Sequence, residues 1–347
     1  MPRKKNRSIP EPAPLKLVRD FEKAHSGVWD ICEMLRDALT QNGFFWDSRC
    51  YIPSAPCVEF VHMDGWCDSG IEESAAATWM YTLASWRRYK EIYSFDGDFA
   101  DILMMSATDE VIPSNFLNSL PYPSFYVSID GKNDLDVDGF FCCIDCYFES
   151  QDDCRPTLTI VANSNSGVVA IPIIIQDGMT LKDSMDRIKS WGLERGEDFD
   201  YDEAIDHSKV FAEKALQLIL YICATNADIE ENVTQKSIRR KSADATKPKD
   251  VLREIRKWDV GYRIGSIVRK SKQNPDSQDS DENHKTTKSK KSSSKRPHSR
   301  RGHFHHFWIG SEKDGTRRLV LKWVAPMFIN AQYEEITATI NMIDNQV

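Results

Sequence analysis

Apolar residues recur every three or four positions between residues 18 and 86, which is the period of one buried helix face. This spacing predicts one helix over residues 18–39, ended by Gly43, and a second helix that begins at Ser69. Glu72 stands three residues after Ser69 and completes a capping box. The basic residues at the end of the second helix, 87–90, suit the helix dipole, and we expect them to be solvated.

From residue 125 onward the apolar period changes to two, which is the period of a β-strand. Four segments rich in β-branched and aromatic residues are separated by short turns of Asp, Asn, Ser and Gly, so an antiparallel β-meander is predicted. Helical spacing returns after Thr180 and predicts two more helices, over residues 181–191 and 211–222, the first of them capped by Thr180 with Asp183. The predicted fold class is therefore α+β, a meander packed with helices. The four predicted strands are Phe125–Ile129, Gly139–Phe148, Thr157–Val161 and Val168–Ile175.

Two short motifs in this region imitate metal sites. Asp134-x-Asp136-x-Asp138-Gly139 copies the opening of a calcium loop, but strands rather than helices are predicted around it. Cys143-x-x-Cys146 has no second cysteine pair, and on a strand its two positions point to opposite faces. We therefore expect an acidic turn and two buried free thiols, with no metal and no cofactor.

Charge is divided unevenly along the chain. The net charge is −8, but residues 1–235 carry 20 Lys and Arg against 40 Asp and Glu, a net −20. Residues 236–347 carry 25 against 13, a net +12. A basic end on an acidic body indicates an anionic partner for that end, most often nucleic acid.

The sequence predicts a cytoplasmic protein. No apolar run approaches the roughly 18–20 residues of a membrane span. The basic N-terminus leads into Pro-rich sequence without the apolar core of a secretory signal. Nine cysteines, an odd number at irregular spacing, favour reduced thiols over a disulfide framework.

Composition divides the chain into five predicted parts. The segment rich in Lys and Ser cannot bury enough apolar surface to fold alone, so it is expected to be a disordered linker. The parts are a flexible basic lead-in (1–14), an acidic α+β body (15–235), a basic and partly helical segment (236–270), the linker (271–296) and a His/Arg/aromatic region (297–347).

The last part carries the most specific chemistry. Residues 298–306 hold four of the eight histidines, among arginines and aromatic residues. Asp314-Gly315 supplies a turn before Arg317–Trp323, so a β-hairpin is predicted. On its first strand, positions 303, 305 and 307 share one face, and 304, 306 and 308 share the other.

Several functions suit this hairpin, and the residues leave the choice open. Arginines can grip phosphates while aromatic rings stack on unpaired bases. Paired histidines can act as general base and acid in metal-free RNA cleavage, a His-x-His pair can bind a metal, and a basic hairpin can simply pack its rings into a core. RNA contact is favoured, through Arg296, His298, Arg300, Arg301, His303, His305 and Trp308, and the candidate catalytic residues of a ribonuclease are His298, His303, His305 and His306.

A second motif lies upstream, where Gly261 and Gly265 are four residues apart. Such spacing lets a backbone approach a phosphate or another helix closely. Arg263 and Arg269 flank these glycines and are predicted as secondary RNA contacts.

These motifs resemble those of a type V-A anti-CRISPR family of phages and plasmids. The resemblance extends from about residue 70 to the end, and the C-terminal motif is its most specific part. The residues that carry it are Arg296-Pro297-His298 through Trp308-Ile309-Gly310, Leu321-Lys322-Trp323, Phe328-Ile329-Asn330 and Gly261-x-Arg263-x-Gly265-Ser266-x-Val268-Arg269.

The resemblance implies a protein that lowers production of a type V-A Cas effector nuclease. It implies recognition of the nascent N-terminal peptide of the effector during translation, followed by loss of the message. The implied partners are that peptide and the mRNA or ribosome. The target of this chain, the place of the peptide pocket, the oligomeric state, and the choice between cutting RNA and recruiting a host nuclease stay open. A ribonuclease and a general RNA-binding protein of a mobile element are the alternatives.

Overall fold

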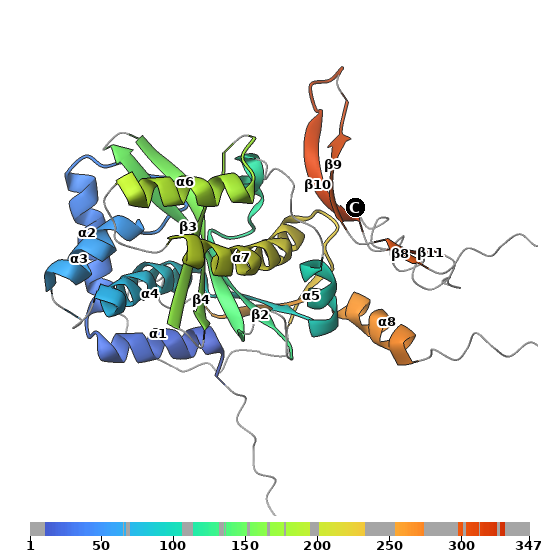
Figure 1. The fold of residues 1–347 in the computed structure, drawn as a ribbon, viewed down its shortest axis with the longest axis horizontal. Coiled ribbons are helices and arrows are strands. Elements are labelled where there is room, and N and C mark those ends of the chain that lie inside the picture. Colours follow the sequence, from blue (N-terminus) through green and yellow to red (C-terminus); the bar gives the residue numbers. More distant parts are fainter. Residues whose placement is uncertain are drawn as a thin grey trace, which may run out of the picture.

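The computed structural model describes residues 11–329 with internal gaps, of which the longest are 106–113, 195–200, 233–253 and 274–297. Its centre is a seven-stranded mixed sheet with the strand order β5-β4-β3-β2-β1-β7-β6. Figure 1 shows the sheet with helices on both sides. The strands are β1 (Glu91–Phe95), β2 (Ser124–Ile129), β3 (Gly139–Ser150), β4 (Asp153–Ser164), β5 (Gly167–Ile174), β6 (Ile229–Glu231) and β7 (Arg256–Val260).

The predicted antiparallel meander is confirmed, since β2, β3, β4 and β5 pair in sequence order. Strands β1 and β7 were not predicted; they run parallel to β2 and extend the sheet. Cys143 and Cys146 on β3 are buried free thiols, as expected. Asp134 and Asp136 of the calcium-like motif lie outside the described residues.

One helix prediction is wrong. The segment predicted as a single helix over 18–39 forms two, α1 (Ala13–Ala24) and α2 (Val28–Gln41). Gly27 stands between them with φ +81, a left-handed conformation that interrupts the helical hydrogen bonds and that glycine adopts without strain. The apolar spacing continues across the break because both helices bury residues in the same core.

The remaining helices are α3 (Ser54–Asp64), α4 (Gly70–Tyr89), α5 (Gly97–Met104), α6 (Leu181–Glu194), α7 (Tyr201–Cys223) and α8 (Tyr262–Gln273), with a 3₁₀ turn at Ser114–Ser119. The capping box of α6 is present: the Asp183 carboxylate accepts from the Thr180 backbone N–H at 2.9 Å. None of the helices that the structure describes contains an apolar stretch of the length that a membrane span requires.

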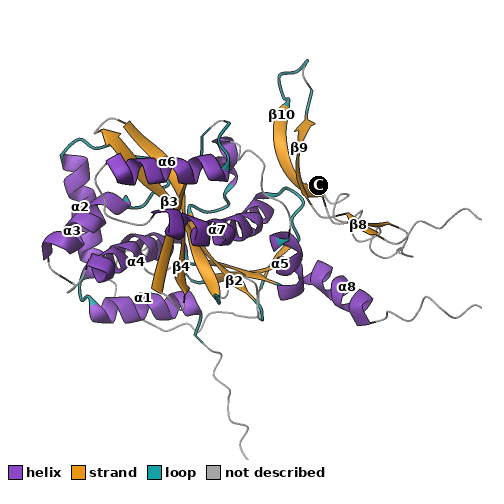
Figure 2. Cartoon of the chain, viewed as in Figure 1, coloured by secondary structure: helices purple, strands orange, loops and turns teal. Residues whose placement is uncertain are grey.

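Helices cover both faces of the sheet, as Figure 2 shows by element type. Phe125 and Phe140 face a core completed by α5, α6 and α7. The next residues along the same strands, Tyr126 and Phe141, face a second core completed by α1 to α4. Because both faces of the sheet are buried, the strands position their ends firmly, and those ends build the site described below.

A buried carboxylate fixes β7 to β1. Glu91 is fully buried and accepts hydrogen bonds from Arg256 Nε at 2.9 Å and from Trp258 Nε1 at 2.7 Å. Tyr122 also accepts from Arg256, at 2.6 Å. The sheet therefore includes strands from both sides of the composition boundary at residue 235. The predicted domain limits themselves stay predictions.

The predicted β-hairpin is present. β9 (His303–Ile309) pairs antiparallel with β10 (Arg318–Val324), and Gly315 in the turn has φ +65. β8 (His298–Arg300) pairs with β11 (Met327–Ile329). Val324 opposes His303 and Met327 opposes Arg300, so both ladders have the same register, and we call the pair of ladders the ribbon.

Candidate functional site

Three parallel strands end at one edge of the sheet, and polar residues follow each of them. Asp96 follows β1, Asp130 follows β2, and Gly261 with Tyr262 follows β7. In sheets with parallel strands, ligands bind most often at the carboxyl ends. Asp96 also caps the N-terminus of α5, where its carboxylate accepts from the Phe99 backbone N–H at 3.3 Å.

Helix α8 lies across this edge, and the two glycines of its motif allow the close approach. Gly261 has φ +72, and a Cβ there would overlap the ring of Phe99. A Cβ on Gly265 would overlap the carboxylate of Asp96. Of the two explanations that the spacing allowed, a phosphate or a packed helix, these contacts show the second: α8 packs against α5 and its cap.

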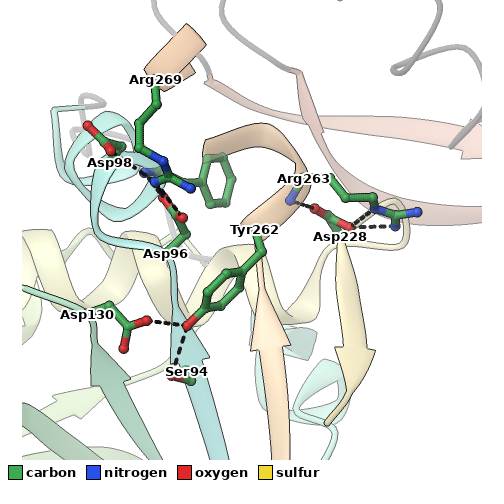
Figure 3. Close-up of polar contacts among 9 residues, drawn as sticks. Ser94, Asp96, Asp98, Asp130, Asp228, Tyr262, Arg263 and Arg269 are labelled. Atoms are coloured by element: carbon green, nitrogen blue, oxygen red, sulfur yellow. Dashed lines mark hydrogen bonds and ion pairs between the residues drawn. The ribbon is translucent and has the colours of Figure 1, made fainter. Parts of the chain in front are cut away.

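Three side chains of α8 hold it in place (Figure 3). Tyr262 donates its hydroxyl hydrogen bond to the carboxylate of Asp130. Arg263 Nε lies 2.6 Å from Asp228 Oδ1, and the Arg263 backbone N–H donates to Oδ2 of the same carboxylate at 3.2 Å. Arg269 Nη1 lies 2.7 Å from Asp96 Oδ2 and 3.0 Å from Asp98 Oδ2. We call these contacts of Tyr262, Arg263 and Arg269 the α8 network.

The electrostatics of the α8 network are those of closed ion pairs. The hydrogen bond to Asp228 raises the pKa of Arg263, and the bonds to Asp96 and then Asp98 raise the pKa of Arg269. Burial, followed by the bond to Asp130, raises the pKa of Tyr262. Since Asp96, Asp98 and Asp228 already hold arginines and Asp130 accepts from Tyr262, the network suits a fixed anchor for α8 better than a set of general bases.

The described part of the chain contains no group of three or more His, Cys, Asp or Glu side chains that could hold a metal ion. The predicted contacts Arg263 and Arg269 keep part of their surface open, with side chains 51% and 43% exposed. Their RNA contact stays a prediction.

The ribbon carries the other predicted site residues that the structure describes. The His305 and Phe307 rings lie 4.6 Å apart, and the Arg317 guanidinium stacks 4.7 Å over the Trp308 ring. Phe307 is 39% exposed and Trp308 is 60% exposed, so neither ring packs into a core. This disfavours, for these two rings, a hairpin that serves only to fill the core.

The predicted residues fall on separate elements. Arg263 and Arg269 stand on α8, whereas His305 and Trp308 stand on β9, and Figure 1 shows the ribbon apart from α8. Strands β8 and β9 include the backbone of His298, Arg300, His303 and His306, while Arg296 and Arg301 lie outside the described residues. The structure therefore describes two groups rather than one assembled site.

Sequence reasoning missed the acidic half of the α8 network. Its residues are Asp96, Asp98, Asp130 and Asp228. A usable signal was present, because Asp96 and Asp130 each come directly after a short strand that contains two aromatic residues. Without β1 and β7 in the predicted sheet, nothing indicated that these carboxylates would meet.

Comparison with known proteins agrees with this architecture. A solved structure titled "Crystal structure of AcrVA2" superposes with a TM-score of 0.56 at 18% sequence identity, covering 91% of this chain and 98% of that chain. At this identity the likeness shows a shared fold. No curated protein matches the chain.

A family model extends the comparison to sequence. The AcrVA2-like model, described as the anti-CRISPR type V subtype A2 family, matches residues 93–331. That range runs from β1 through the α8 network to the end of the ribbon. The chain therefore belongs to the AcrVA2-like anti-CRISPR type V subtype A2 family.

Proposed function

We propose that this chain lowers production of a type V-A Cas effector nuclease while the effector is being translated. The body recognises the nascent N-terminal peptide of the effector, and the basic C-terminal region contacts the mRNA or the ribosome. Recognition then triggers loss of the message. Such action takes place in the cytoplasm of the bacterial host.

The observation that carries the proposal is the family match over residues 93–331, which includes both the sheet and the ribbon. The exposed surface of the ribbon supports the second half of the proposal. Trp308 stacked under Arg317 offers a flat ring beside a cation, a combination that suits unpaired bases and phosphates.

Two features support a rigid scaffold behind the ribbon. The α8 network fixes the helix that precedes residues 274–297, and the Glu91 contacts fix β7 before it. The segment that leads to the ribbon therefore starts from an anchored position on the body.

The test is expression of the chain beside a type V-A effector, with effector mRNA and protein both measured. We expect both to fall. Unchanged levels of mRNA and protein would contradict the proposal for this target.

Two altered effector genes separate peptide recognition from RNA recognition. In the first, the opening codons are replaced by synonymous codons, so the peptide is kept and the RNA changes. In the second, a compensated frameshift over the same codons changes the peptide and keeps most of the RNA. We expect repression of the first and escape of the second; the reverse pattern would assign recognition to RNA.

A further inference from the structure

The end of α4 holds a concentration of cations that the family match does not include. Arg87, Arg88 and Lys90 stand there, and Arg36 reaches the same place from α2. The Arg87 guanidinium lies 4.1 Å over the Trp29 ring. Arg36 and Arg88 lie 4.4 Å and 5.4 Å from the centre of the Tyr51 ring. We call these four cations, with their two rings, the α4-end cluster.

The cluster is not the solvated helix end that the sequence predicts. Arg87 and Lys90 are both partly buried. Burial lowers the pKa of Arg87, and burial together with the charge of Arg87 lowers the pKa of Lys90. Lys90 also has φ +55, a left-handed conformation that costs a non-glycine residue about 1 kcal/mol or more. The cations therefore lie close together although both their partial burial and their mutual repulsion are unfavourable.

Among the described residues, a carboxylate forms an ion pair with Arg36, and none forms one with Arg87. Glu33 binds Arg36 at 2.7 Å and accepts the hydroxyl hydrogen bond of Tyr51. Glu22 and Asp30 attract Arg87 from a distance, but no carboxylate of the described residues lies within the 4.0 Å of an ion pair with it. Arginine is rarely buried without a partner, so Arg87 lacks the counter-charge that its position calls for.

Unused donors accompany this missing charge. Trp29 is 8% exposed, and its buried Nε1 has no hydrogen-bond acceptor among the described residues. The buried Nε of Arg36 also has none in that part of the chain. A buried donor without an acceptor costs about 1–3 kcal/mol, and such sites call for an explanation.

We propose that the α4-end cluster is a binding site for a carboxylate presented by an acidic peptide segment. A guanidinium stacked on a ring keeps its edge open for the two parallel hydrogen bonds that a carboxylate accepts. One carboxylate supplies the charge that Arg87 lacks. A nucleic acid fits less well, because one carboxylate is enough to neutralise Arg87, whereas a row of phosphates would be repelled by the net −20 of residues 1–235. The site lies before residue 93 and does not depend on the proposed function.

The first experiment is selection of random heptapeptides displayed on phage against the full chain. We expect enrichment of Asp or Glu at one position. A synthetic copy of an enriched peptide should bind at least tenfold more tightly than the same peptide with Gln at that position. Arg87→Gln should lose both the enrichment and the tenfold difference.

Arg19→Gln is the matched control, because Arg19 is exposed and already paired with Glu11 and Asp20. It should select and bind like the original chain. Absence of acidic enrichment, or equal enrichment by Arg87→Gln, would overturn the proposal. Binding of a twelve-nucleotide RNA that depends on Arg87, without peptide binding, would assign the site to nucleic acid and also overturn it.

The second experiment measures thermal unfolding of Arg87→Met. Since no ion pair is lost and a partly buried charge is removed, we expect the midpoint to stay unchanged or to rise. If this variant fails to fold, Arg88→Gln with Arg36→Gln tests the same peptide by binding, with the same tenfold loss expected. A lowered midpoint together with no acidic selection by the original chain would make the Arg87 stack purely structural.

Discussion

The arginines of the α8 network and those of the α4-end cluster look alike in sequence and differ in structure. Arg263 and Arg269 each lie on a nearly fully buried aspartate, and their charge is used inside the molecule. Arg87 lies on an indole ring without such a partner among the described residues. The difference shows that a run of basic residues indicates an external anionic partner only where no carboxylate of the same molecule already pairs with those residues. The following predictions test this contrast, beginning with the largest expected effect.

Substitution of Gly265 by valine should undock α8. The new side chain would occupy the position of the Asp96 carboxylate, which also caps α5, so ion pair and cap are lost together. We expect a loss of about 3 kcal/mol or more in the free energy of unfolding, measured with a chemical denaturant. Ser266→Ala, one position along the helix, is the control and should stay within about 0.5 kcal/mol.

Asp228→Ala should lower the free energy of unfolding by less, about 2 kcal/mol. The loss is smaller because Arg263 is half exposed and water can solvate it. Arg263→Gln should cost about 1 kcal/mol. Together the two variants should show a coupling energy of about 1 kcal/mol in a double-mutant cycle. Strict additivity would mean that the pair contributes nothing to the anchor.

The contrast is tested directly by the same change at Arg269 and at Arg87. Arg269→Met leaves Asp96 buried without its cation and should cost about 1 kcal/mol, discounted because the arginine is 43% exposed. Arg87→Met should cost nothing. Equal losses at the two positions would show that stacking on Trp29 stabilises the fold as much as an ion pair does.

A pH series compares an arginine that is paired with a carboxylate, Arg49, with Arg87, which has no carboxylate in ion-pair contact among the described residues. The bond from Arg49 lowers the pKa of Asp47 below its ordinary 3.8. The folded carboxyl therefore holds its proton less tightly than the unfolded one, so its stabilisation is complete above the ordinary value and is lost as the pH falls through the lowered one. Asp47→Asn should flatten this acid part of the stability curve, whereas Arg87→Met should leave it unchanged.

The smallest effect on stability is expected on the ribbon. Trp308 is 60% exposed, so Trp308→Ala should change the free energy of unfolding by less than about 0.5 kcal/mol. Repression of the effector and affinity for RNA should nevertheless fall. Loss of stability without loss of RNA binding would mean that the ring serves the fold.

Elements whose partners lie close along the chain could be predicted from the amino-acid sequence alone. Alternation and turn residues were enough for β2 to β5 and for the hairpin of β9 and β10, because each strand pairs with the next one. The capping box of α6 is local in the same way. The family resemblance also came from continuous motifs in the last third of the chain.

The contacts between segments far apart along the chain became visible only in the folded structure. β1 pairs with β7 although Glu91 and Arg256 are 165 positions apart, and parallel pairing leaves no turn signal between its strands. That pairing brings Asp96, Asp228 and α8 together, and it reveals Gly265 as a packing residue. The partial burial of Arg87 could not be predicted from the sequence either, because it depends on which distant segments cover the end of the helix.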